Sequence, residues 1–390
     1  MIPLGLPMRR FEPVLWLTML SLLLSPAEAG HELPVYPSYY PQEIRVEVVE
    51  PAQAGARLAD ARIHAYLGAE PAAGLPGPDT VSAIESLGSF LVLTFDPEFV
   101  QRHQRDARCA AAARLGRRAA AGQGRFVFHP YPVTPYHADY LQHFDLAEAS
   151  RQRYLSAAAD PASARAPALR VRAEGALAER LFGPPGPRAG QPWDATAAEV
   201  PAAGLVASRA FAVNGWLGPP WIKEGWFQAL ALLGETVRDA GAREAEGSLA
   251  LRLKRGEYAT PEEGLDLERA LVTRLLSGCE RVVLGYTVKR EYVNTAFSPG
   301  IENIAYDSQL GLDSPLFIRT AKLKDFPWNG WLRIGIATAP RAAWNPMGGF
   351  TDPAGRLIWH ALGDPALVPS PYSAGWVPNR IVDVRAEPRR

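Results

Sequence analysis

The hydrophobic pattern between residues 44 and 69 predicts a strand, a short helix and a second strand. IRVEVVEP (44–51) alternates apolar and polar residues and ends at a proline, which is typical of a strand. AQAGARLADA (52–61) predicts a short helix, and RIHAYLGA (62–69) predicts the second strand, with His64 as a structural residue in its middle. Together the three segments indicate a compact βαβ unit.

The alternation of helices and strands continues to about residue 158. The pattern predicts further elements in this order: a helix at 79–88, a strand at 89–97, a helix at about 99–121, a strand at 124–133 and a helix at 135–158. Strands that alternate with helices indicate an α/β fold with mixed, mostly parallel sheets.

The second half of the chain has its own elements. Helices are expected within 219–241 and from Thr260, where Thr260, Pro261 and Glu263 form a capping box with proline at the first helical position. ERVVLGYTVKREYV predicts a strand, and the segment 315–340 predicts two strands around a tight loop. From about residue 340 the chain is rich in Gly, Pro and Trp, which we interpret as an extension with few helices.

Differences in amino-acid composition along the 390 residues predict the domain boundaries. The segment 159–198 is full of Pro, Gly and Ala and is the best linker candidate. We therefore expect an α/β domain at 30–158, a linker at 159–198, and a second α/β domain with a Trp-rich tail at 199–390.

The first residues, 1–29, have the pattern of an export signal. Arg9 and Arg10 precede a short apolar run, and an Ala-x-Ala ending predicts cleavage after Ala29. The run is short for a membrane span, which takes about 20 residues. We expect a periplasmic protein; the alternative is an uncleaved signal that anchors the chain in the membrane.

Net charge, cysteine content and missing motifs exclude several classes of partner and cofactor. Lys+Arg and Asp+Glu both number 41, so no overall field attracts nucleic acid or an anionic membrane. Two cysteines, Cys109 and Cys279, form one disulfide in an oxidising compartment or remain as buried thiols. The sequence lacks dinucleotide, phosphate-loop, haem and nucleophile-elbow motifs, so no cofactor is predicted other than a divalent metal.

The stretch HPYPVTPYHADYLQHFD (129–145) holds the residues for such a metal. Its candidate ligands are His129, His137, His143 and Asp139. Asp139 and His143 are four residues apart on the expected helix, so their side chains can meet. His137 and His143 would point about 120° apart, and a shared ion would need a distant ligand. The simpler interpretation is an Asp139–His143 surface pair with histidines bonded to nearby backbone.

Tryptophans concentrate after residue 190, and the sequence NGWL occurs twice. Asn-Gly favours a tight turn, which would present the following Trp at its edge. Such indole rings make flat apolar platforms with an N–H donor, although they also build ordinary cores. The candidate ligand-binding residues are Asn214, Trp216, Trp221, Trp328, Asn329 and Trp331.

The stretch IRVEVVEPAQAGARLADARIHAYLG, about 25 residues, resembles the opening of the two-lobed periplasmic substrate-binding proteins of transporters. The resemblance implies two α/β lobes around a cleft, no catalysis, and a small-molecule ligand held by aromatic and a few polar groups. A membrane permease or an envelope complex would be the partner. The alternatives are a metal-dependent periplasmic hydrolase or oxidoreductase that uses the histidine stretch, and a structural or accessory protein of an envelope complex.

Overall fold

The computed structural model describes residues 41–378, apart from a set of short segments. The gaps are at 73, 123–124, 157–168, 184–191, 210–219, 235–239, 328–329, 342–349, 351, 364–366, 372 and 374. The predicted export signal, residues 1–29, lies outside the described residues. Within the described residues, none of the helices combines the length and the apolar character that a bilayer crossing requires.

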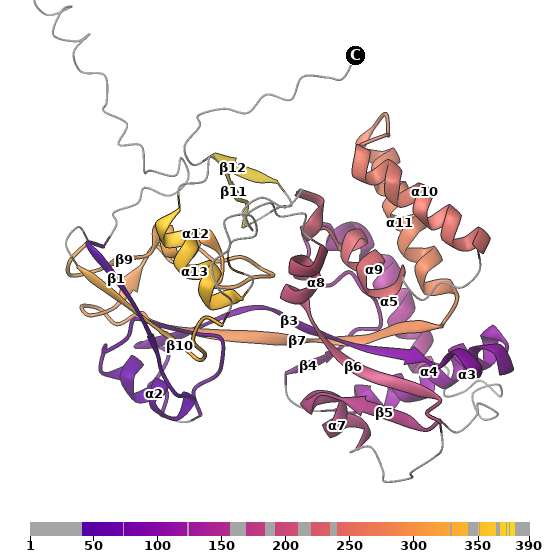
Figure 1. The fold of residues 1–390 in the computed structure, drawn as a ribbon, viewed down its shortest axis with the longest axis horizontal. Helices are drawn as coiled ribbons and strands as arrows, with labels where there is room; N and C mark the ends of the chain where they lie inside the picture. Colours follow the sequence, from indigo (N-terminus) through magenta and orange to yellow (C-terminus); the bar gives the residue numbers. More distant parts are fainter. Residues whose placement is uncertain are drawn as a thin grey trace, which may run out of the picture.

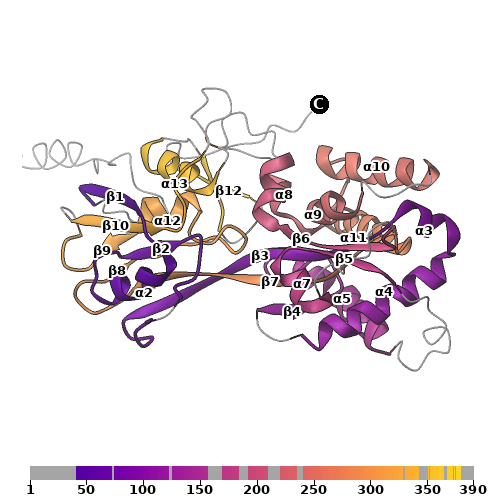
Figure 2. The same ribbon diagram turned by 60° about the horizontal axis from the view of Figure 1, so that its bottom comes forward.

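Two lobes share one pair of long strands (Figure 1). The strands β3 (Val81–Phe95) and β7 (Arg281–Asn294) pair antiparallel along most of their length. They extend from one lobe into the other, as the turned view in Figure 2 also shows. The predicted α/β class and the two lobes are therefore confirmed.

The large sheet has the order β1-β10-β2-β7-β3-β6-β5, with β4 paired to β7. The strands that join β3 and β7 are β1 (Glu43–Val48), β2 (Ala65–Leu67), β4 (Phe126–Phe128), β5 (Val171–Glu174), β6 (Ala195–Pro201) and β10 (Trp331–Ile336). The sheet is mixed, because β1–β10, β10–β2 and β5–β6 are parallel while β2–β7, β3–β7, β3–β6 and β4–β7 are antiparallel.

The first lobe surrounds β1, β10 and β2. Its other elements are α2 (Pro51–Ala59), β8 (Ile301–Glu302), α12 (Pro315–Thr320), β9 (Lys322–Leu323), α13 (Pro353–Leu362), β11 (Leu367–Pro369) and β12 (Trp376–Pro378). The predicted unit at 44–69 is present as β1, α2 and β2, with β10 inserted between the two strands. Leu332 and Ile334 of β10 pack with Phe317 of α12 in the core of this lobe.

The second lobe covers both faces of the sheet with helices. They are α3 (Pro97–Arg102), α4 (Arg105–Ala120), α5 (Tyr140–Ser156), α7 (Ala176–Phe182), α8 (Ala202–Arg209), the 3₁₀ turn η3 (Pro220–Lys223), α9 (Gly225–Leu233), α10 (Ala240–Arg255) and α11 (Pro261–Ser277). Alternate residues of β3 enter opposite cores: Phe90 packs toward α9 and α11, and Leu91 packs toward α4 and α7. A strand buried on both faces has a continuous apolar run, which explains SFLVLTF in this part of β3.

Some predicted elements are wrong. The segment 79–88 was expected to be a helix, but from Val81 it forms the beginning of β3, where Glu85 lies opposite Arg290 and binds it at 2.8 Å. Cross-strand pairing with β7 decides the structure here, over any helical tendency. The first six residues of 315–340 form the helix α12, because Ser314 caps it and Pro315 is its first residue. The extension after residue 340 contains α13.

The predicted domain boundaries also differ from the lobes. The described part of 159–198 contains β5, α7 and the start of β6, and β6 pairs with β3 in the large sheet. β1 near the start of the described chain pairs with β10 near its end, so each lobe uses both halves of the sequence. Residues far apart in the chain pair in this sheet, and composition does not report such pairing.

One disulfide joins Cys109 in α4 to Cys279, which lies just before β7. The paired interpretation of the two cysteines is therefore confirmed. Both cysteines of the chain are used in this bond.

Candidate functional site

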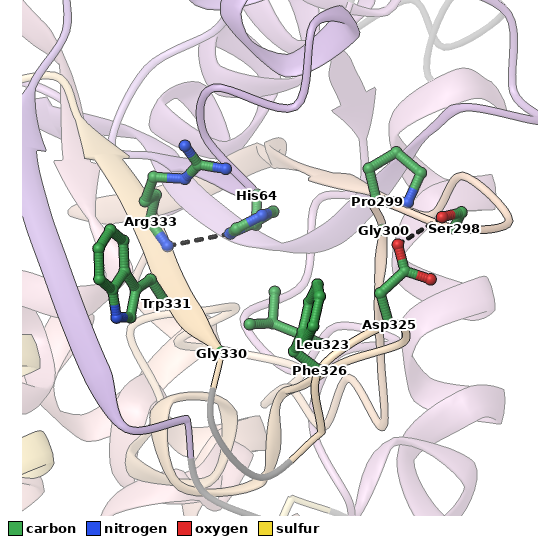
Figure 3. A pocket seen from close by; sticks show the side chains of 10 residues that line it. All are labelled: His64, Ser298, Pro299, Gly300, Leu323, Asp325, Phe326, Gly330, Trp331 and Arg333. Atoms are coloured by element: carbon green, nitrogen blue, oxygen red, sulfur yellow. Dashed lines mark hydrogen bonds between the residues drawn. The ribbon is translucent and has the colours of Figure 1, made fainter.

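A pocket of about 390 Å³ lies at the edge of the first lobe, where one predicted ligand-binding tryptophan is exposed (Figure 3). Trp331 begins β10 and is 50% exposed, and Phe326 in the loop before it is 65% exposed. Aromatic side chains of this size that remain in water beside a recess are typical of binding surfaces.

Three segments build the walls of this pocket. Trp331 and Arg333 come from β10, Leu323 comes from β9, and Ser298 comes from the turn after β7. Figure 3 shows Trp331 and Arg333 on one side, and Asp325 and Ser298 on the other. The lining is mainly apolar, with polar groups at few positions. That composition is usual for pockets that bind small molecules.

Hydrogen bonds fix the polar residues of the pocket. The backbone N–H of Arg333 donates to Nδ1 of His64 at 3.0 Å, and its Nη2 donates to the carbonyl of Ala61 at 2.9 Å. The hydroxyl of Ser298 donates to the carboxylate of Asp325. Burial and the nearby Arg333 charge lower the pKa of His64 to about 4, so its ring is neutral at pH 7.

Trp331 has a cationic neighbour on the adjacent strand. The guanidinium carbon of Arg45 lies 4.5 Å from the centre of the indole ring, which is within cation–π range. Arg45 is on β1, and β1 pairs with β10 in parallel. One face of the Trp331 indole ring is therefore in contact with the Arg45 guanidinium.

The other predicted ligand-binding residues are not gathered at this pocket. Trp221 lies in the second lobe, where its ring is 4.7 Å from that of Phe227 and 5.9 Å from that of Trp226. It packs against the apolar core around α9, which is the core interpretation of the tryptophans. The remaining candidates lie outside the described residues: Asn214, Trp216, Trp328 and Asn329.

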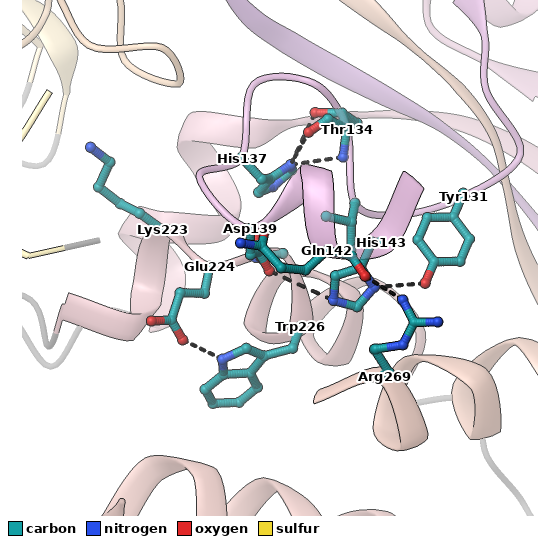
Figure 4. Close-up of polar contacts among 12 residues, drawn as sticks. Tyr131, Thr134, His137, Asp139, Gln142, His143, Lys223, Glu224, Trp226 and Arg269 are labelled. Carbon is teal, nitrogen blue, oxygen red and sulfur yellow. Dashed lines mark hydrogen bonds and ion pairs between the residues drawn. The ribbon is translucent and has the colours of Figure 1, made fainter. Parts of the chain in front are cut away.

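The histidine stretch lies in the second lobe (Figure 4). Its helix, α5, begins at Tyr140 and not at Pro135. The hydroxyl of Thr134 lies 3.0 Å from Nδ1 of His137, and residues 135–139 form turns and a bend. Pro135 therefore lies in a turn before the helix and is not its first residue.

His129 and His137 do not join a common metal set with His143. Nε2 of His129 lies 2.8 Å from the carbonyl of Val133. His137 uses both ring nitrogens, Nδ1 toward the Thr134 backbone N–H at 2.9 Å and Nε2 toward Oε1 of Gln228 at 2.9 Å. Both histidines are buried. His129 bonds nearby backbone, as in the simpler interpretation of this stretch, but His137 also bonds a side chain 91 residues away.

Asp139 and His143 do meet, but not at the surface as in the simpler interpretation: the side chain of His143 is 0% exposed and that of Asp139 is 13% exposed. A third residue joins them. Oδ2 of Asp139 lies 3.9 Å from Nε2 of His143. Within the described residues, a carboxylate oxygen of Glu268 on α11 completes a group whose potential ligand atoms lie within 4.8 Å of one another. Burial, with the charges of Glu224 and Asp139, raises the pKa of Glu268 to about 8. No sequence pattern links Glu268 to this stretch, because it lies 125 residues after His143.

A second recess of about 590 Å³ lies beside the disulfide, between α4, α5 and α11. Cys109, Cys279 and Tyr154 contribute to its walls. Of its aromatic residues, Tyr131 is 2% exposed and belongs to the core. It offers no exposed aromatic side chain comparable to Trp331.

Among the comparisons with known proteins, the search of solved structures found similar chains. No family model matches the chain, and no curated protein matches its sequence. The solved structures that it resembles include periplasmic binding proteins, the class that residues 44–68 resemble.

Three of these structures illustrate the likeness. The binding protein AgaA of A. tumefaciens R10, in complex with agropinic acid, is 15% identical with a TM-score of 0.34, over 70% of this chain and 55% of its own. The oligopeptide-binding protein AppA of Bacillus subtilis, with a nonapeptide, is 10% identical with a TM-score of 0.36, over 70% and 58%. The EDTA-binding protein EppA is 12% identical with a TM-score of 0.40, over 71% and 57%. The chain therefore spans a little more than half the length of these structures.

Proposed function

We propose that the chain is a small-molecule-binding protein, and that its ligand binds in the pocket between Trp331 and Asp325. The observation that carries the proposal is the half-exposed indole of Trp331 beside an apolar recess of about 390 Å³. A recess of this size suits a small organic molecule, since ligand pockets measure about 300–1,000 Å³.

The pocket residues define the ligand chemistry. A planar or apolar part of the ligand would stack on Trp331 and contact Phe326, because both rings are exposed. A polar or cationic group would be oriented by Asp325, whose carboxylate is already fixed by Ser298. The neutral His64 ring carries no charge into the pocket at pH 7. Binding and not catalysis is the activity that this set of groups supports.

We also propose that the protein works outside the cytoplasm and delivers its ligand to a membrane permease. The disulfide Cys109–Cys279 supports this location, because such bonds persist in oxidising compartments. The export pattern at residues 1–29 agrees with it.

A ligand screen with matched variants tests this proposal. Purified protein is screened by thermal shift against amines, aromatic acids, sugars and short peptides, and each compound that raises Tm is measured by calorimetry. Trp331→Ala should weaken binding about 10-fold or more, since one stacked aromatic ring contributes about 1–3 kcal/mol.

The control variant is Phe297→Ala, which removes an aromatic ring of 94% exposure that is not part of the pocket lining. It should bind as the wild type does. If no compound class raises Tm, or if Trp331→Ala and Phe297→Ala bind equally well, the proposed pocket is wrong.

A further inference from the structure

Two helices of the second lobe, α5 and α11, bring two carboxylates and one imidazole to a common point. Asp139 directly precedes α5, His143 lies in the first turn of α5, and Glu268 lies in the middle of α11. One nitrogen or oxygen from each residue lies within 4.8 Å of the other two. This cluster is in a different lobe from the pocket of Trp331 and does not depend on the proposed function.

His143 points an unused nitrogen into the cluster. Its side chain is fully buried, and its Nδ1 lies 2.8 Å from the hydroxyl of Tyr131 (Figure 4). Its Nε2 is buried with no hydrogen-bond partner and faces Asp139 at 3.9 Å. A buried polar atom without a partner is costly, and such an atom in a native site calls for an unseen water or ion.

The hydroxyl of Tyr131 suits the orientation that a metal ligand needs. When Nδ1 carries the proton and donates to the Tyr131 oxygen, Nε2 keeps its lone pair toward Asp139 and Glu268. Histidines that bind metals usually donate their other N–H to such a neighbour. Asp139 is oriented in a similar way, since its two carboxylate oxygens accept the backbone N–H of Gly225 at 3.0 and 3.1 Å.

The side chains around the cluster are mainly acidic, which favours a cation over an anion. Glu224, the N-cap residue of α9, adds a third acidic side chain close to Asp139 (Figure 4). Among the described residues, no Lys or Arg forms an ion pair with any of the three. Arg269, which follows Glu268, binds Asp145 at 2.7 Å instead.

We propose that Asp139, His143 and Glu268 bind one divalent transition-metal ion of the zinc class. Two carboxylates and an imidazole are a ligand set for Zn²⁺, with a fourth position left open. Two ligands at about 2.0–2.1 Å from a tetrahedral ion lie roughly 3.3–3.5 Å apart. The Asp139–His143 separation of 3.9 Å therefore needs only a small side-chain adjustment. The bound ion would tie α5 to α11.

Zinc binding by the full chain, without a histidine tag, tests this inference. The protein is stripped with a chelator and titrated with Zn²⁺ by calorimetry, and the bound metal is measured after dialysis. We expect one Zn²⁺ per chain and a rise in Tm with added zinc. Glu268→Gln should weaken zinc binding at least 10-fold. Glu262→Gln, a control at an exposed position of the same helix, should leave it unchanged.

A second measurement on the wild type keeps the test decisive if a variant fails to fold. Co²⁺ in place of Zn²⁺ should give the intense visible absorption of a tetrahedral site. Less than a tenth of an equivalent of bound zinc, a weak octahedral Co²⁺ spectrum, or unchanged affinity in Glu268→Gln would each overturn the inference. Because Trp331 lies in the other lobe, Trp331→Ala should not change zinc binding, which separates this result from that of the ligand screen.

Discussion

At the residue scale, two buried histidines make the fold sensitive to acid. His64 is 4% exposed and His360 is 8% exposed. Burial is the main cause that lowers the pKa of each to about 4, helped by Arg333 at His64 and by Arg356 at His360. Nδ1 of His64 accepts the backbone N–H of Arg333, which a ring protonated at that nitrogen cannot do.

Stability should therefore fall as the pH decreases from 6.5 toward 4. In this range the unfolded chain, with a His pKa of about 6.5, binds more protons than the folded chain, so protonation favours unfolding. For one such histidine, the free energy of unfolding is lower by roughly 3 kcal/mol at pH 4 than above pH 6.5. Urea unfolding at several pH values measures the slope. His64→Asn, which keeps an acceptor for Arg333, should reduce it; equal slopes in variant and wild type would refute this cause.

Single residues were predicted where their chemistry is local. The Asp139–His143 contact was predicted from a spacing of four on a helix, and it forms although Asp139 directly precedes α5. Trp331 was singled out because it follows Asn-Gly, and it is exposed beside a recess. Trp221 was chosen because it lies close to the first NGWL copy, but it packs on Phe227. The sequence motif does not say whether a core forms behind the ring.

At the element scale, the disulfide is the strongest link between α4 and the start of β7. It closes a loop across a sequence separation of 170 residues. In the chain-entropy model such a loop is worth about 5 kcal/mol, and measured losses on removal are about 2–5 kcal/mol.

Cys109→Ala with Cys279→Ala should lower the free energy of unfolding by about 2–5 kcal/mol in denaturant titrations. Cys279 has a φ of 50°, in the left-handed region that favours glycine. Cys109→Ala with Cys279→Gly should therefore retain up to about 1 kcal/mol more than the double alanine variant. If the reduced wild type and both variants unfold at the same denaturant concentration as the oxidised wild type, the bond has no stabilising role.

Elements with local signals were predicted well. At α11 the hydroxyl of Thr260 accepts the N–H of Glu263 at 3.2 Å, and the carboxylate of Glu263 accepts the N–H of Ala259 at 2.7 Å. These contacts join residues that are three or four positions apart, so the sequence pattern predicts them. The first half of β3 was misassigned because its partner strand β7 comes about 200 residues later. Pairing over that distance overrides local propensity.

At the scale of the whole molecule, the segment between β8 and α12 joins the two lobes. Lys223 of the second lobe binds the carboxylate of Asp307, whose side chain is 1% exposed. The side chain of Gln309 donates to the carbonyl of Lys223 at 2.6 Å, and the hydroxyl of Ser308 donates to the carbonyl of Tyr136 at 2.8 Å. These contacts hold the lobes in one arrangement.

Breaking the Lys223–Asp307 pair should destabilise the protein more than removing both charges. Asp307→Asn leaves the Lys223 ammonium with little solvent and should cost about 3–5 kcal/mol. Adding Lys223→Met should recover part of this loss, because no unpaired buried charge remains. A double-mutant cycle from denaturant unfolding measures both effects. Additive losses would show that the two side chains do not interact.

The central claim is that a small molecule binds against Trp331, and a crystal structure of the complex tests it most directly. The compound with the largest thermal shift is crystallised with the full protein. We predict ligand density stacked on Trp331 and in contact with Phe326, with a polar group in reach of Asp325. Density in the recess beside Cys109 and Cys279, or elsewhere with the Trp331 pocket empty, would contradict the account.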